Sequence, residues 1–239
     1  MQNIFKEYEK QFDVFESEVK YGMKNISLHY TINTLGKNNE IALNSTPEFW
    51  NYTLYNLATI SILTLGRIFD VNAEYSINKL FDLLGKSLDY FSFDNIRERK
   101  EWNCTDEEYE EYLKDKKAFE LMDYRRLREI KKRVQKMYDS IYKQYRHSII
   151  AHRLILDTAE IDSGGKFKYI DILEIYIELY NIQNELWERA FNGRKGKKLT
   201  FEILNDQVEN LHDFTNGTPE YIYILRDFEK ILGLLNANR

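Results

Sequence analysis

The sequence has little of what several structural classes require. Its 239 residues include one cysteine, two prolines and four histidines. A single cysteine, Cys104, excludes a disulfide framework and a thiolate metal site. The longest nearly apolar run, TISILTLGRIF, is too short to span a bilayer, so no membrane segment is expected. The N-terminus lacks the basic patch and apolar stretch of a signal peptide, which predicts a soluble protein of a reducing cytoplasm.

Apolar and aromatic side chains are plentiful. Apolar residues make up 43% of the chain and aromatic residues 15%, a composition typical of a folded protein. The net charge of −5 speaks against a nucleic-acid binder when it is taken as a total. Charge is segregated, however: residues 124–153 hold ten Lys or Arg against two carboxylates, so this segment carries +8 and the rest of the chain −13.

Helix-start signals recur along the chain. Both prolines follow threonine, at 46–47 and 218–219, and a threonine N-cap with proline at the first helical position opens a helix. Thr105 with Glu108 forms a capping box that predicts another helix start. Alternating strand-like runs bounded by hairpin turns are absent, and the sequence therefore predicts an all-α fold.

One glycine-rich basic stretch, FNGRKGKKLT at 191–200, is the best candidate for a boundary. It lacks the frame of a phosphate-binding P-loop and is predicted to be a flexible, exposed turn. We expect residues 1–192 to form a helical domain. Residues 193–239 are expected to form a C-terminal helical extension packed on the same domain, because two short helices bury little surface alone.

The basic segment has a helical apolar face of its own. Its members recur at spacings of three or four: Leu127, Ile130, Val134, Met137, Ile141, Tyr145 and Ile149. The next position in this series is His152, and Arg146 lies about 120° from it at about 100° per residue. His152 is therefore either a packed core histidine or, with Arg146, part of a site that flanks a groove. An arginine and a histidine at this spacing are expected by chance in a chain of this composition. The spacing alone therefore does not distinguish the two alternatives.

The context of the spacing is more specific. The phrase YRHSIIAHR, which contains Arg146, His147, His152 and Arg153, ends the strongly basic segment. With the upstream SILTLGRIFD it resembles the HEPN superfamily, and within it the AbiU-type abortive-infection branch, over about residues 45–190. The resemblance implies a HEPN-like helical bundle, here with extra C-terminal helices. Leu154 stands where the family phrase often continues with aspartate.

The resemblance implies an activity and its residues. Arg146 and His152 match the catalytic arginine and histidine of HEPN ribonucleases, and His147 the polar residue between them. Such enzymes cut RNA without a metal or cofactor, as homodimers whose motifs face one cleft, and a toxin or phage-defence role with an antitoxin partner is expected. Tyr145 and His147 are candidates for assisting roles. The alternative is a HEPN-like module that binds RNA or protein without cutting.

The residue chemistry suits that reaction. A histidine titrates near neutral pH and can move the protons of the RNA 2′-hydroxyl and leaving oxygen. A guanidinium stays charged and matches phosphoryl oxygens bidentately. No histidine pair has the i, i+4 spacing of a helical metal site, so no metal is expected.

Several side chains are candidates to hold the RNA or to support the site. The cations expected to contact the backbone are Lys131, Lys132, Arg133, Lys136, Lys143 and Arg153. Tyr138, Tyr142 and Tyr145 are candidates to stack on bases, although charge on a helix is often only a solvated face and tyrosines at this spacing often pack. Arg67 and Asp70, at the end of an apolar helix, support the site from a second helix or, as we favour, serve the fold.

Overall fold

The computed structural model describes residues 2–36, 39–100, 103–145, 168–211 and 219–237. In these ranges the chain is helical and contains no strand, which confirms the all-α prediction. The long helices are α1 (Gln2–Gly36), α3 (Pro47–Phe69), α7 (Leu121–Tyr145), α9 (Tyr169–Asn192) and α11 (Glu220–Ala237). Shorter ones are α2 (Glu40–Leu43), α4 (Ile77–Leu84), η1 (Leu88–Phe91), α5 (Phe93–Arg99), α6 (Asp106–Leu113) and α10 (Phe201–Glu209).

Helix starts follow the local signals in the sequence. Pro47 occupies the first position of α3, as predicted, and fixes its own φ there, but the side chain of the N-cap residue Thr46 makes no capping hydrogen bond. Thr105 and Glu108 form the predicted reciprocal capping box at the start of α6. α9 ends at Asn192, and the capping residue Gly193 has a φ of 60°, the left-handed conformation that glycine adopts without steric cost.

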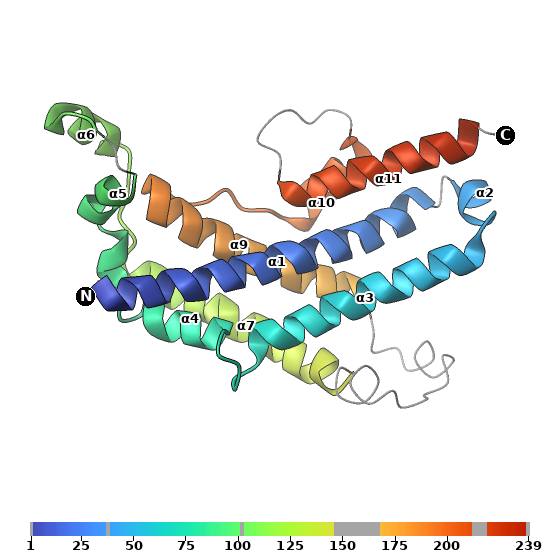
Figure 1. Cartoon of the computed structure of the whole chain (residues 1–239), viewed down its shortest axis with the longest axis horizontal. Coiled ribbons are helices and arrows are strands. Elements are labelled where there is room, and N and C mark those ends of the chain that lie inside the picture. Colours follow the sequence, from blue (N-terminus) through green and yellow to red (C-terminus); the bar gives the residue numbers. More distant parts are fainter. Residues whose placement is uncertain (1, 37–38, 101–102, 146–167, 212–218, 238–239) are drawn as a thin grey trace.

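The long helix α1 organises the bundle. It runs along most of the molecule and packs against α3, α9, α11 and α4, while α7 packs on α9 and α3 (Figure 1). The main core lies between these helices and is rich in large side chains such as Tyr8, Met23, Phe91 and Tyr176, which are almost fully buried. A second, smaller cluster around Trp50 and Phe228 joins α3 to α11.

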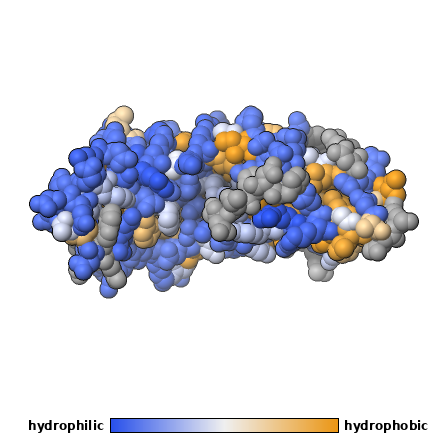
Figure 2. Space-filling model, turned by 90° about the horizontal axis from the view of Figure 1, so that it is seen from above, coloured by the Kyte–Doolittle hydropathy of each residue, from blue (hydrophilic) through white to orange (hydrophobic). Residues whose placement is uncertain are grey.

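The C-terminal helices pack on this bundle. α11 contacts α1 and α2, and Tyr221 and Ile222 at its start are buried in the main core. Apolar side chains gather toward the end of the molecule that carries α2 and the C-terminus, whereas the opposite end of this face is mainly hydrophilic (Figure 2). The division of the chain between residues 192 and 193 stays a prediction.

Candidate functional site

The catalytic candidates follow directly on the last turn of α7. This helix ends at Tyr145, and the residues after it, Arg146, His147, His152 and Arg153, lie outside the described ranges. Their roles, and that of the Tyr145 side chain, stay predictions. The described part of the site consists of α7 and the C-terminal end of α3, which packs beside it (Figure 1).

The apolar face of α7 is turned to the core. Leu127 and Val134 are buried, and Ile130 and Met137 are half-buried against the same cluster. The predicted periodicity is thus confirmed as far as Met137, because one side of the helix meets α9 and α3 along this row.

Tyr138 belongs to the core and not to an RNA-facing surface. Its exposed fraction is 3%, and its ring stacks on Phe69 of α3 with centroids 5.1 Å apart and planes 23° apart. Of the two alternatives for this tyrosine, the burial of its side chain and the stacked Phe69 ring support packing. Sequence spacing alone did not reveal the aromatic partner on another helix.

Most described cations of α7 face solvent. Six of them, Arg133 included, are exposed, and five of these fall within about 80° around the axis at about 100° per residue: Arg125, Arg128, Lys132, Lys136 and Lys143. We call this row the α7 basic stripe. Glu129 pairs with Lys132 at 2.7 Å and Asp139 with Lys143 at 3.6 Å, so the stripe remains net positive. Helical spacing would have revealed Arg125 and Arg128, which were not among the predicted RNA contacts.

The remaining described cations of α7 bind side chains of neighbouring helices, and Arg133 does so at the surface. Arg133 binds Glu178 of α9 at 2.8 Å, and Arg126 binds Glu185 of the same helix. Lys131 is half-buried and donates to Asn78 of α4, and burial lowers its pKa. Arg133 and Lys131 therefore lie to either side of the stripe, with their charged groups directed at neighbouring helices.

A polar pocket of about 300 Å³ lies where the ends of α3 and α7 meet. Asp70 and Asn72 line it from α3 and the following turn, and Gln135, Asp139 and Lys143 line it from α7. Asp70 also accepts a hydrogen bond from the Asn72 backbone at 2.9 Å. Lys143, in the lining of this pocket, lies about one helical turn before Arg146 in the sequence. A supporting role of Asp70 at the site stays a prediction, and its hydrogen bond from the Asn72 backbone fits the structural role that we favour.

Arg67 is directed elsewhere. Its guanidinium makes a bidentate ion pair with Glu18 of α1, with Nε–Oε1 at 2.9 Å and Nη2–Oε2 at 2.7 Å, and also donates to Thr64. The side-chain hydrogen bond to Glu18 raises the pKa of Arg67. This contact joins α3 to α1, which is what a structural role for Arg67 requires.

His29 of α1 is a buried histidine close to the start of α9. Its exposed fraction is 8%, its ring lies 4.9 Å from the Tyr169 ring, and Nδ1 lies 3.3 Å from Nδ2 of Asn33. Burial lowers the pKa of His29 to about 4 from its ordinary 6.5. His29 is thus neutral at pH 7 and packs in the core. This agrees with its position among apolar residues of the sequence.

The buried His29 predicts an acid-dependent loss of stability. Above pH 6.5 neither state binds the proton, and as the pH falls toward 4 the unfolded chain takes it up first. The free energy of unfolding should fall by about 3 kcal/mol over this range from this residue. Urea unfolding at several pH values would measure it, and His29→Phe should show a shallower pH dependence. Parallel curves for the two proteins would contradict the prediction.

Two further observations concern membrane-spanning helices and metal-binding groups among the described residues. No helix in the described ranges is long and apolar enough to cross a membrane. Within the same ranges, no group of three or more His, Cys, Asp or Glu side chains is arranged to hold a metal ion.

An all-helical bundle whose basic helix leads into an arginine–histidine phrase is the architecture of a HEPN-type protein. The model of the HEPN_AbiU2 family, described as AbiU2, matches residues 5–215, and the chain belongs to this family. The match is longer than the region of resemblance in the sequence and includes most of α1 and all of α10. Comparisons with curated proteins and with solved structures gave no match.

Proposed function

We propose that the protein is a metal-independent endoribonuclease that acts as a toxin or phage-defence effector. In this reaction the RNA 2′-oxygen forms a bond to the adjacent phosphorus while the bond from phosphorus to the 5′-oxygen breaks. The products are a 2′,3′-cyclic phosphate and a 5′-hydroxyl. His152 would transfer a proton at one of these oxygens, and Arg146 would neutralise the phosphoryl oxygens.

The observation that carries the proposal is the α7 basic stripe. It presents five exposed cations on one side of a helix, and the next residue after that helix is Arg146. A row of Lys and Arg binds a phosphate backbone without regard to sequence, by releasing counterions. RNA that follows the stripe would be led toward Arg146 and His152. Family membership supports the same class of module.

A second proton-transfer group is still needed for a complete reaction. In the proposal it comes from a second copy of the chain, so that the protein acts as a homodimer with the phrase near the two-fold axis. An antitoxin protein that covers the stripe or the phrase is the corresponding regulator. Sedimentation of the purified protein would measure the oligomeric state.

The test is cleavage of an RNA pool in EDTA by the wild type and by His152→Ala. The wild type should produce cyclic-phosphate ends, and the variant should lose at least about a hundredfold in rate with an unchanged melting temperature. His212→Ala, a histidine outside the phrase, is the matched control and should cut normally.

Other outcomes would reassign the phrase. If neither protein cuts but both bind RNA, the chain is a non-catalytic RNA-binding HEPN module. If His152→Ala melts earlier by the equivalent of about 1–3 kcal/mol, His152 is a packing residue.

A further inference from the structure

The segment that links α9 to α10 is held along α9 by hydrogen bonds. The Asn181 side chain accepts from the Leu199 N–H at 2.7 Å and donates to its carbonyl at 2.8 Å. Asn184 Nδ2 donates to the Lys197 carbonyl at 2.9 Å. A Cβ on Gly196 would lie 2.7 Å from Asn184 Nδ2 and 3.0 Å from the Asn184 carbonyl oxygen, so a larger residue there would force Asn184 or the segment to shift. The segment expected to be a flexible turn is therefore held to α9 at Lys197 and Leu199.

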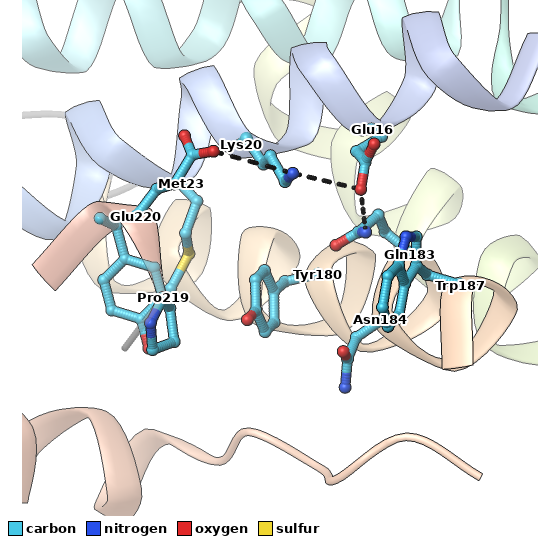
Figure 3. A pocket seen from close by; sticks show the side chains of 10 residues that line it. Glu16, Lys20, Met23, Tyr180, Gln183, Asn184, Trp187, Pro219 and Glu220 are labelled. Carbon is cyan, nitrogen blue, oxygen red and sulfur yellow. Dashed lines mark hydrogen bonds and ion pairs between the residues drawn. The ribbon is translucent and has the colours of Figure 1, made fainter. Parts of the chain in front are cut away.

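This segment forms one wall of a groove. A hollow of about 580 Å³ lies between it and α9, with Tyr180 and Asn184 from α9 and Tyr221 from α11 in its lining. A second hollow, of about 330 Å³, shares these three residues and Pro219 and continues between α9 and α1. Tyr180, Asn184 and Trp187 project from one side of α9 into this space (Figure 3).

The charge on the groove wall is positive and largely unpaired. Arg194 and Glu188 neutralise each other through a bidentate contact, with Nε–Oε2 at 2.7 Å. The other three cations are exposed and form no ion pair with any residue the structure describes: Lys195, Lys197 and Lys198. Three like charges within four positions repel one another, and no ion pair with a described residue offsets this repulsion. An anionic ligand would remove this repulsion.

The groove is separate from the α7 basic stripe. Around α9, Tyr180 and Trp187 lie about half a turn from Glu178 and Glu185, the residues that bind α7, at about 100° per residue. In Figure 1 the segment before α10 and the helix α7 lie on opposite sides of α9. A ligand in the groove would therefore occupy a different face of the molecule.

We propose that this groove binds a phosphate-bearing nucleotide, with phosphate held by Lys195, Lys197 and Lys198 and the base laid against Tyr180. Lysine ammonium groups bind phosphate as mobile point charges, and an aromatic ring offers a base a sequence-independent stacking surface. The nucleotide is either part of a single-stranded RNA or a free nucleotide. The binding needs no cleavage and is independent of the proposed ribonuclease activity.

The test measures binding of two probes in EDTA to full-length protein that carries His152→Ala, so that RNA stays intact. The probes are a fluorescein-labelled oligoadenylate of about twelve nucleotides and free ATP. The groove variant is the triple Lys195→Gln, Lys197→Gln, Lys198→Gln. The matched control removes three exposed lysines elsewhere, by Lys6→Gln, Lys86→Gln and Lys230→Gln.

We expect the groove variant to bind the probe at least about tenfold more weakly and the control variant less than about twofold more weakly. For RNA, the slope of log K against log salt should also decrease by about 2, because three phosphate contacts are lost. Tyr180→Leu should weaken binding about tenfold without changing the salt slope.

The probe that responds identifies the source of the nucleotide. Loss of oligoadenylate binding alone would assign the groove to RNA, and loss of ATP binding to a free nucleotide. Equal affinities for the groove and control variants with both probes would overturn the proposal, whether or not the wild type cuts RNA.

Discussion

Replacement of Arg189 by alanine should lower the free energy of unfolding by about 3 kcal/mol. Arg189 lies on α9 with its side chain 4% exposed, and Glu185 one turn earlier is 7% exposed. The guanidinium binds Asp123 of α7 at 3.4 Å and donates to the carbonyl of Lys117. Its loss leaves buried acceptors and a buried carboxylate with fewer partners. The value is at the low end for a buried pair because Arg126 still binds Glu185.

The matched control is Arg67→Ala, which breaks a bidentate ion pair at the surface. Arg67 is 52% exposed, so water screens the pair and the expected loss is below about 1 kcal/mol. Thermal unfolding would distinguish the two variants. In a chain of this size the melting temperature should fall by about 10 °C for Arg189→Ala and by a few degrees or less for Arg67→Ala. Equal shifts in melting temperature would show that burial does not determine how much these ion pairs stabilise the fold.

The ion-pair cluster of Asp123, Arg126, Glu185 and Arg189 also matters for the proposed function. It joins the beginning of α7 to α9, and α7 carries the basic stripe toward Arg146. A loosened α7 would misplace the stripe, so Arg189→Ala should also weaken RNA binding when measured well below its melting temperature.

Gly22→Ala should be at least as damaging, with an expected loss of about 3 kcal/mol. Gly22 lies on α1 where that helix meets α9, and a Cβ there would overlap the ring of Tyr176. Tyr176 is fully buried and donates to the Ser61 carbonyl of α3 at 2.7 Å. To make room, the ring must leave this hydrogen bond or α1 must move from α9. Overpacking costs about 1–3 kcal/mol and an unsatisfied buried hydroxyl a similar amount, reduced by about 1 kcal/mol of helix propensity.

Gly233→Ala is the control for this substitution. Gly233 is also inside a helix, α11, but a Cβ there meets nothing within 4 Å. Alanine should therefore stabilise by up to about 1 kcal/mol through propensity alone. Chemical denaturation of both variants would measure the opposite signs. A stabilising Gly22→Ala would mean that α1 and α9 are not in close contact at this point.

The sequence by itself determined the local features of this protein. Pro47 at the start of α3, the capping box of Thr105 and Glu108, and the row from Leu127 to Met137 depend on neighbours within one or two helical turns. For that reason the all-α class could be predicted, whereas the family was recognised from the resemblance of YRHSIIAHR and SILTLGRIFD. Arg146 and His152 were also named from sequence, and their roles stay predictions because they lie outside the described residues.

The tertiary structure decided which side chains are available to a ligand. Arg125 and Arg126 are neighbouring arginines of one basic helix, yet Arg125 faces solvent and the half-buried Arg126 binds Glu185, 59 residues away. Tyr138 is buried because Phe69 lies on a different helix, and the backbone at Lys197 is fixed because Asn184 reaches it from α9. Such contacts join residues that are distant in sequence, so no local pattern could reveal them. They depend on how α3, α7 and α9 pack together.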